Sequence, residues 1–369
     1  MIYLDNGATS FHKPPAVYRA VEAAMKTCAN PGRGGYGAAM EASRRLFACR
    51  EAAAEIFDCQ PEQVVLTANC THGLNIAIRS VAKPGARVVV TGFEHNAVMR
   101  PLYALGAKIT VAGRKLFDRQ DTLEAFARAL EKGQDAAVFT HVSNVFGYIL
   151  PVEEMADMCA KREIPFVIDA AQSAGTLPLA FDKLGADFIA MPGHKGLLGP
   201  QGTGLLLCGN RGEPLLYGGT GSASRSREMP EDLPERLEAG TVNVPGFAGL
   251  TEGLRYLKKT GIGTVYEREH RQLQTCAAGL KKLGFRVFSG PDQASTVSFL
   301  PGMDCEEAAQ LLGKQGIALR AGLHCAPLAH ESAGTLKTGT LRVSFGFDAS
   351  DRETLAFLQA ASKLPRKQG

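Results

Sequence analysis

The sequence lacks the features that mark several classes of protein. It has no block of lysines and arginines, and its formal net charge is only +4, so we expect no nucleic-acid partner. No apolar run approaches the length that spans a membrane, and the N-terminus lacks a basic segment followed by an apolar core. We therefore expect a cytoplasmic protein that does not associate with membranes.

The cysteines also lack the pattern of a disulfide or metal framework. There are nine of them, an odd number, and none forms a Cys-x-x-Cys pair. This scatter argues against disulfides and a zinc site and favours a reducing compartment. We expect no metal, and most of the cysteines should be small buried hydrophobic residues.

What is present is a chain of 369 residues with 45% hydrophobic and 21% charged residues, an ordinary globular composition. Strand-like and helix-like segments alternate over much of it, which predicts an α/β fold with a mostly parallel, helix-covered sheet whose strand ends share one edge. We expect residues 15–258 to form this large domain. Residues 1–14 and 259–369 should form a small α+β domain, with strands at 295–299, 317–320 and 340–344.

Further boundaries follow from local patterns. Helices are expected at about 40–57, where apolar side chains recur at helical spacing, and at about 264–283. The segment 218–238 is rich in glycine, serine, proline and charged residues and is expected to be a long loop.

Two apolar runs each end in a polar group. The run 164–168 is followed by Asp169, and the run 187–191 leads to Lys195. The carboxyl ends of parallel strands open into the crevice where such sheets bind ligands. A lysine and an acid there suit pyridoxal phosphate, because the lysine can hold the cofactor as a Schiff base while the carboxylate partners the pyridinium nitrogen. Alone, either residue would more often be a helix cap or a surface charge.

Five segments, taken in order, resemble a known family. They are DNGATS at residues 5–10, EHNAV at 94–98, DAAQS at 169–173, GHK at 193–195 and RAGLHC at 320–325. Together they resemble the cysteine desulfurase and selenocysteine lyase branch of the class V aminotransferases, which are fold type I pyridoxal phosphate enzymes. The resemblance runs nearly end to end and implies a seven-stranded type of sheet and a homodimer.

The resemblance implies roles for residues around the cofactor ring. Lys195 would be the Schiff-base lysine and Asp169 the partner of the ring nitrogen. Gln172 and Asn144 would donate to the ring hydroxyl. His95 would stack on the ring and assist proton transfer.

The cofactor phosphate is expected at the N-terminus of a helix that opens near Thr71, where unpaired N–H groups and the helix dipole favour an anion. The candidates are Thr71 and the backbone N–H of Cys70 or His72, with His194 nearby. The sequence departs from the family at Asn69-Cys70 and at Pro192, where relatives carry other residues. By resemblance, Thr241 would supply a hydroxyl across a dimer interface.

Cys325 is predicted to be the nucleophile. Its loop is polar and glycine-rich, and His324 stands beside it, a setting in which a cysteine can reach the thiolate state. The resemblance implies that this cysteine takes sulfur from the substrate and carries it as a persulfide. The short span to the next strand resembles the branch with a compact loop, which suggests a dedicated acceptor protein.

Substrate contacts are expected from Arg342, Asn6, Tyr36 and Asn144. Arg342 aligns with the arginine that clamps the substrate α-carboxylate, a bidentate task that suits arginine over lysine. Without the family context it would be interpreted as a surface arginine on an edge strand. Tyr36 stands where relatives have histidine, and Arg33 is a further candidate in the same glycine-rich loop.

The predicted reaction is the conversion of L-cysteine to alanine with a persulfide on Cys325, and L-selenocysteine is an alternative substrate. A second hypothesis is a class V aminotransferase or epimerase that never forms a persulfide. A third is a degenerate fold retained as a sulfur carrier or scaffold.

Overall fold

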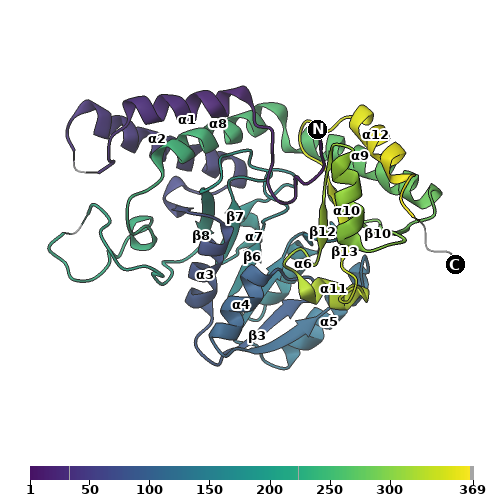
Figure 1. Cartoon of the computed structure of the whole chain (residues 1–369). Coiled ribbons are helices and arrows are strands. Elements are labelled where there is room, and N and C mark those ends of the chain that lie inside the picture. Colours follow the sequence, from purple (N-terminus) through teal and green to yellow (C-terminus); the bar gives the residue numbers. More distant parts are fainter. Residues whose placement is uncertain (33, 223, 366–369) are drawn as a thin grey trace.

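The computed structural model describes residues 1–32, 34–222 and 224–365, so Arg33 lies outside the described residues. A seven-stranded sheet, in the order β2-β8-β7-β6-β5-β3-β4, forms the centre of the larger part of the molecule (Figure 1). Its strands are β2 (Val64–Thr67), β3 (Arg87–Thr91), β4 (Lys108–Ala112), β5 (Ala136–Thr140), β6 (Phe166–Asp169), β7 (Phe188–Pro192) and β8 (Gly204–Cys208).

Strand β8 breaks the expectation that all strand ends share one edge. It pairs antiparallel with both β7 and β2, whereas β3 to β7 pair in parallel. A parallel connection needs a long crossover, usually a helix. The segment between Pro192 and Gly204 is too short to hold one and returns directly along β7. The expectation is therefore wrong for β8, and the segment that carries Lys195 is this tight return.

The central strands are buried on both faces, as expected for strands covered by helices. In β6, Phe166 and Ile168 contribute to one hydrophobic cluster, and Val167 contributes to the other. This alternation follows from the two-residue period of a strand. The covering helices are α2 (Gly37–Phe57), α3 (Cys70–Val81), α4 (Asn96–Ala104), α5 (Arg119–Glu131), α6 (Val152–Ala160) and α7 (Phe181–Leu184).

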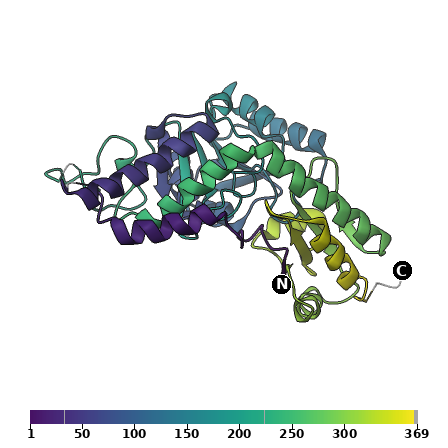
Figure 2. The same cartoon turned by 90° about the horizontal axis from the view of Figure 1, so that it is seen from above.

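Helix α2 begins at Gly37, three residues before the predicted start. It packs against α8 (Val244–Thr260), which also contacts α1 (Pro15–Thr27). Helix α9 (Ile262–Lys282) follows α8 almost immediately and leads to the second part of the molecule, as seen from above in Figure 2.

The second part contains a four-stranded antiparallel sheet in the order β12-β13-β10-β9. Its strands are β9 (Arg286–Phe288), β10 (Thr296–Leu300), β12 (Arg320–Gly322) and β13 (Thr340–Ser344). Helices α9, α10 (Cys305–Lys314) and α12 (Asp351–Ala361) share a hydrophobic cluster with this sheet. A short helix, α11 (Pro327–Ala333), follows β12 and was not predicted, and neither was β9.

The predicted strand at 317–320 is two strands that belong to different sheets. β11 (Ile317–Ala318) pairs in parallel with β1 (Ile2–Tyr3), and β12 pairs with β13. The chain changes partner at Leu319, a long-range event that local apolar pattern does not encode. The β1–β11 pairing supports the prediction that the N-terminal residues belong to the small domain, which stays a prediction.

Among the described residues, none of the helices has the length and apolar character needed to cross a membrane. The same part of the chain contains no group of three or more side chains placed to bind a metal ion.

Candidate active site

A cavity of about 110 Å³ opens at the carboxyl ends of β5, β6 and β7. The structure brings eight of the predicted site residues into its wall. They are Cys70, Thr71, His95, Asn144, Asp169, Gln172, His194 and Lys195. Pro192, at the end of β7, also lines it, so this point of the wall has no hydroxyl.

Asp169 is the last residue of β6 and is 3% exposed. The Ala171 N–H donates to its Oδ1 over 2.9 Å, and the Cys70 thiol lies 3.6 Å from the same oxygen. Burial raises the pKa of Asp169, while the Ala171 N–H and the nearby Lys195 act in the opposite direction. Both contacts converge on one oxygen of the carboxyl group.

Cys70 is the first residue of α3, and its thiol is directed at Asp169. Burial and the carboxylate of Asp169 raise the pKa of this thiol well above its usual value, so it stays a neutral S–H group. Asn69 caps α3 by accepting the N–H of His72 over 2.9 Å. That cap removes His72 from the expected phosphate donors and leaves the backbone of Cys70 and Thr71.

Lys195 lies in the tight return between β7 and β8. Desolvation lowers its pKa, and the positive charge of Arg342 lowers it further. A lysine with a depressed pKa has a larger neutral fraction at neutral pH and can act as a nucleophile or base.

His95 is the N-cap of α4, and its Nδ1 accepts the Ala97 N–H over 3.0 Å. Nδ1 is therefore an acceptor, and a neutral ring carries its proton on Nε2. Burial, with the charge of Lys195, lowers the pKa of His95 to about 4, so the ring is neutral at pH 7. His194 behaves similarly: burial lowers its pKa to about 4, and its buried Nδ1 has no partner in the described part of the chain.

The residue before His95 is the first residue of the EHNAV motif. Glu94 is fully buried, and its Oε1 accepts from the backbone N–H groups of Thr91 and Thr140 and from the Thr91 hydroxyl. Burial raises its pKa to about 8. Glu94 thus ties β3 to β5 directly beside His95. Its only sequence signal was a carboxylate next to a histidine at a strand end.

Cys325 lies between β12 and α11 and is exposed, whereas Cys28 and Cys59 are half-buried and the other six cysteines are buried. Its carbonyl accepts the Asn96 N–H over 2.8 Å. This bond brings the loop of the small domain against the start of α4, next to His95.

The expected support of Cys325 by His324 is wrong. His324 is 7% exposed, and its Nε2 lies 3.2 Å from both the hydroxyl and the carbonyl of Thr340. Burial, together with the charge of Arg342, lowers its pKa to about 2. A buried neutral ring that contacts Thr340 cannot pair as a cation with a thiolate.

Arg342 is not an edge-strand surface residue. It lies on β13, inside the small sheet, and is 2% exposed. Its Nη2 contacts Asp5 Oδ1 at 2.6 Å, and its Nη1 donates to the carbonyl of Asn144 over 3.0 Å. The buried Nε has no partner among the described residues. The Nε–H group of Arg342 is therefore free of any described partner, and Asp5, the first residue of the DNGATS motif, orients the guanidinium.

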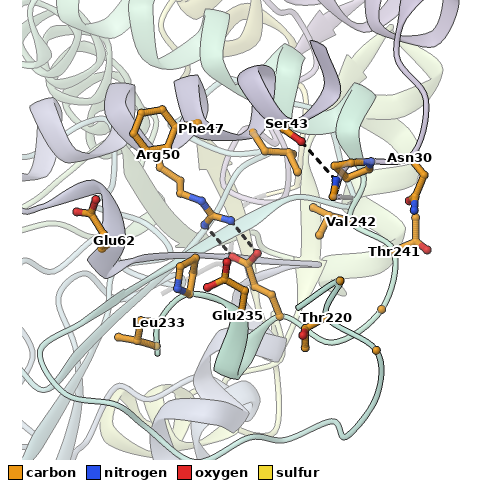
Figure 3. A pocket seen from close by; sticks show the side chains of 18 of the residues that line it. Asn30, Ser43, Phe47, Arg50, Glu62, Thr220, Leu233, Glu235, Thr241 and Val242 are labelled. Atoms are coloured by element: carbon orange, nitrogen blue, oxygen red, sulfur yellow. Dashed lines mark hydrogen bonds and ion pairs between the residues drawn. The ribbon is translucent and has the colours of Figure 1, made fainter. Parts of the chain in front are cut away.

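Five predicted residues do not line the cavity of about 110 Å³: Cys325 and Arg342, described above, and Tyr36, Thr241 and Asn6. Tyr36 is 58% exposed at the start of α2, and Thr241 lines a second cavity of about 800 Å³. Figure 3 shows that second cavity, with Arg50 and Thr241 in its wall. Arg50 forms a buried ion pair with Glu238, which lines the same cavity. Asn6 lines a smaller neighbouring cavity, which Lys195 also reaches.

Comparison with known proteins gives concordant results. The family described as Aminotransferase class-V matches residues 2–357. A protein of Pyrococcus abyssi named "Probable cysteine desulfurase" is 32% identical over 99% of this chain and 94% of its own length. The apo structure of the cysteine desulfurase from Thermococcus onnurineus NA1 superimposes with a TM-score of 0.89 at 31% identity, covering 98% of this chain and 94% of that one. The cysteine desulfurase CsdA from Escherichia coli gives a TM-score of 0.85 at 27% identity, with the same coverage.

Proposed function

This chain belongs to the class-V aminotransferase family, and on that premise we propose that it is a pyridoxal-phosphate-dependent cysteine desulfurase. The family resemblance and the fold of the large, mostly parallel sheet with a smaller second part are confirmed. The observation that carries the proposal is the position of exposed Cys325, whose backbone is bonded to the start of α4 beside the cavity that contains Asp169 and Lys195.

The cavity fits the cofactor. The buried Nδ1 of His194 and Oδ1 of Asn144 have no partners among the described residues, and buried polar atoms are normally satisfied. Lys195 would bind the cofactor covalently, Asp169 would contact its ring nitrogen, and His95 would cover its ring. Gln172 and Asn144 would contact the ring oxygen. The N-terminus of α3, at Cys70 and Thr71, would hold the phosphate. When bound, pyridoxal phosphate supplies an electron sink for the carbanion formed at the substrate's α-carbon.

Side chains of this chain would bind the substrate and transfer its protons. Arg342 Nε would bind the substrate carboxylate, since this buried nitrogen has no partner among the described residues. The Nζ of Lys195 would take the α-proton, a task suited to an amine with a depressed pKa. The neutral His95 would hold or donate a proton at Nε2.

Cys325 would perform the step that gives the reaction its identity. Its thiolate would attack the sulfur of the substrate, forming a sulfur–sulfur bond while the substrate's Cβ–S bond breaks and its electron pair stays with the carbon fragment. Protonation of that fragment yields alanine. The sulfur then remains on Cys325 as a persulfide, exposed to an acceptor protein or a small thiol.

The test is alanine production from L-cysteine and from L-selenocysteine, together with cyanide-releasable sulfane sulfur. We expect alanine and sulfane sulfur from cysteine in the wild type. In Cys325→Ala both should vanish while bound cofactor is retained. Alanine formation by Cys325→Ala at the wild-type rate would refute the persulfide role, and absence of sulfane sulfur in the wild type would favour an aminotransferase or epimerase.

Two alternative hypotheses are the use of selenocysteine as substrate and a degenerate fold that serves as a scaffold. Selenocysteine remains a second proposed substrate and is decided by the same assay, because selenium can leave without attack by Cys325. The scaffold hypothesis is disfavoured because the groups that the cofactor requires, Asp169, His95 and Lys195, line one cavity.

We also propose a homodimer formed through the surface around the larger cavity. Exposed Met40 and Phe47 lie on α2, exposed Tyr36 directly precedes this helix, and the loop that follows β8 adds exposed Tyr217. Such a dimer would bury this surface and would let Thr241 reach the partner's cofactor phosphate. Analytical ultracentrifugation should show a dimer that Phe47→Glu weakens.

The nine free cysteines support the proposed cytoplasmic location.

A further inference from the structure

The loop that carries Cys325 has an unfavourable backbone conformation. His324 and Cys325 are consecutive left-handed residues, with φ of +50° and +56°. Residues other than glycine seldom adopt this conformation, because Cβ approaches the following carbonyl oxygen. Two such residues in succession persist only where other contacts hold them.

Hydrogen bonds from outside the loop hold these two residues. The Asn96 N–H donates to the carbonyl of Cys325 over 2.8 Å. The Nδ2 of Asn144 donates to the carbonyl of His324 over 2.7 Å. The His324 ring also contacts the hydroxyl and the carbonyl of Thr340. Only the contact from Asn144 is made by a side chain that also lines the cavity of Lys195.

Asn144 is therefore the junction of three parts of the site. The residue is 9% exposed and lines the cavity, and its carbonyl accepts from Arg342. Gln172 provides a comparison within the same wall. It carries the same amide group, but its Nε2 donates to the carbonyl of Gly7 over 2.9 Å, away from the Cys325 loop.

We propose that Asn144 is a positioning residue for Cys325, in addition to its place in the cofactor pocket. Its amide donor holds the left-handed pair His324–Cys325 and so keeps the nucleophile against the start of α4. The proposal rests on the proposed function only for the identity of Cys325 as the reacting thiol. The loop contact itself does not depend on turnover.

The experiment is amide hydrogen exchange of residues 323–326 in the enzyme loaded with pyridoxal phosphate, without substrate. Asn144→Ala should accelerate exchange about fivefold, roughly the factor that one neutral hydrogen bond contributes. Asn144→Asp should accelerate it more, since a carboxylate oxygen cannot donate and faces the His324 carbonyl. Gln172→Ala is the matched control and should leave these amides at the wild-type rate.

Two results would overturn the proposal. One is unchanged exchange at 323–326 in both Asn144 variants, and the other is equal acceleration in Gln172→Ala, which would assign the effect to the pocket as a whole. Melting temperatures identify any variant that fails to fold. If Asn144→Ala fails to fold, the exchange rate of Asn144→Asp, which preserves the side-chain shape, tests the proposal. If the loop loosens as expected but the wild type forms no persulfide, the proposed function fails and this inference stands.

Discussion

The two halves of the site hold their reactive groups in different ways. Asp169 ends a buried parallel strand, and Lys195 follows the neighbouring one, with hydrophobic clusters on both faces of the sheet. Cys325 lies in an exposed loop whose left-handed backbone is held by a few hydrogen bonds. Burial and neighbouring charge set the protonation of the first half. The second half depends on loop geometry and access.

The cysteines of the two halves show the same contrast. Cys70 is buried beside Asp169, and burial together with the Asp169 carboxylate keeps it a neutral thiol. Cys325, in contrast, is exposed. A thiol must become a thiolate and reach its target to act as a nucleophile. Proximity to the cofactor pocket is therefore not enough to identify the nucleophile.

The largest expected effect comes from the buried half. Lys195→Ala should lower alanine formation by roughly 10³-fold and remove the absorbance of the lysine-bound cofactor. Lys13→Ala is the matched control, because burial lowers the pKa of Lys13 to about 8 but its Nζ is bonded to Ser10. Spectra and kinetics of both variants decide the matter, and a covalent cofactor surviving in Lys195→Ala would contradict the assignment.

Arg342→Lys should have the next largest effect. We expect KM for L-cysteine to rise at least roughly tenfold with a smaller change in kcat, because lysine cannot reproduce a buried guanidinium donor set. Steady-state kinetics should be compared with Arg320→Lys, which shares the carboxylate of Asp5 but is exposed. An equal rise in KM in the two variants would show that the effect comes from the lost pairing with Asp5 and not from a contact between Arg342 and the substrate.

His324→Asn should have a modest effect on rate, within about fivefold, since asparagine tolerates a left-handed backbone and His324 is neutral. Its pKa is about 2 in the folded state, below the ordinary 6.5, so an unfolded chain binds more protons as the pH falls below 6.5. The free energy of unfolding of the wild type should therefore fall as the pH is lowered from 6.5 to 4.5. It should fall less in His324→Asn, which lacks this titrating group. Chemical denaturation at pH 6.5 and 4.5 measures the difference, and a steeper loss in the variant would be incompatible with a neutral ring.

The smallest expected effect is that of Cys70→Ser. A serine hydroxyl can still donate to Asp169, so the rate of alanine formation should change by less than about threefold. Thiol-specific labelling of the wild type should leave Cys70 unmodified while it modifies Cys325. A rate as low as that of Cys325→Ala would mean that the sulfur chemistry belongs to the buried half.

The contrast also explains what the sequence could predict. Apolar runs that end in Asp169 and before Lys195 are local signals, and the parallel sheet brings their ends together. The family resemblance supplied the fold and the order of the motifs. Local pattern could not predict that β8 runs antiparallel, because that depends on the short return from β7.

The local sequence pattern also could not predict the directions of side chains in the small domain. His324 directly precedes Cys325 in the same loop, but both residues have a left-handed backbone and the His324 ring contacts Thr340. Local pattern without the family resemblance would place Arg342 on the surface, because its pairing with Asp5, from the other end of the chain, is a long-range contact. Thr241 lies in a different cavity from Lys195, so its predicted role requires a second chain.

The most direct test of the division between a buried cofactor half and an exposed sulfur half is peptide mapping after incubation with L-cysteine. Mass spectrometry of the non-reduced protein would locate the added sulfur atom. We predict that it resides on the peptide containing Cys325 and that Cys70 carries none. Sulfur on Cys70, or alanine formed by the intact enzyme with no sulfur found on Cys325, would contradict this account.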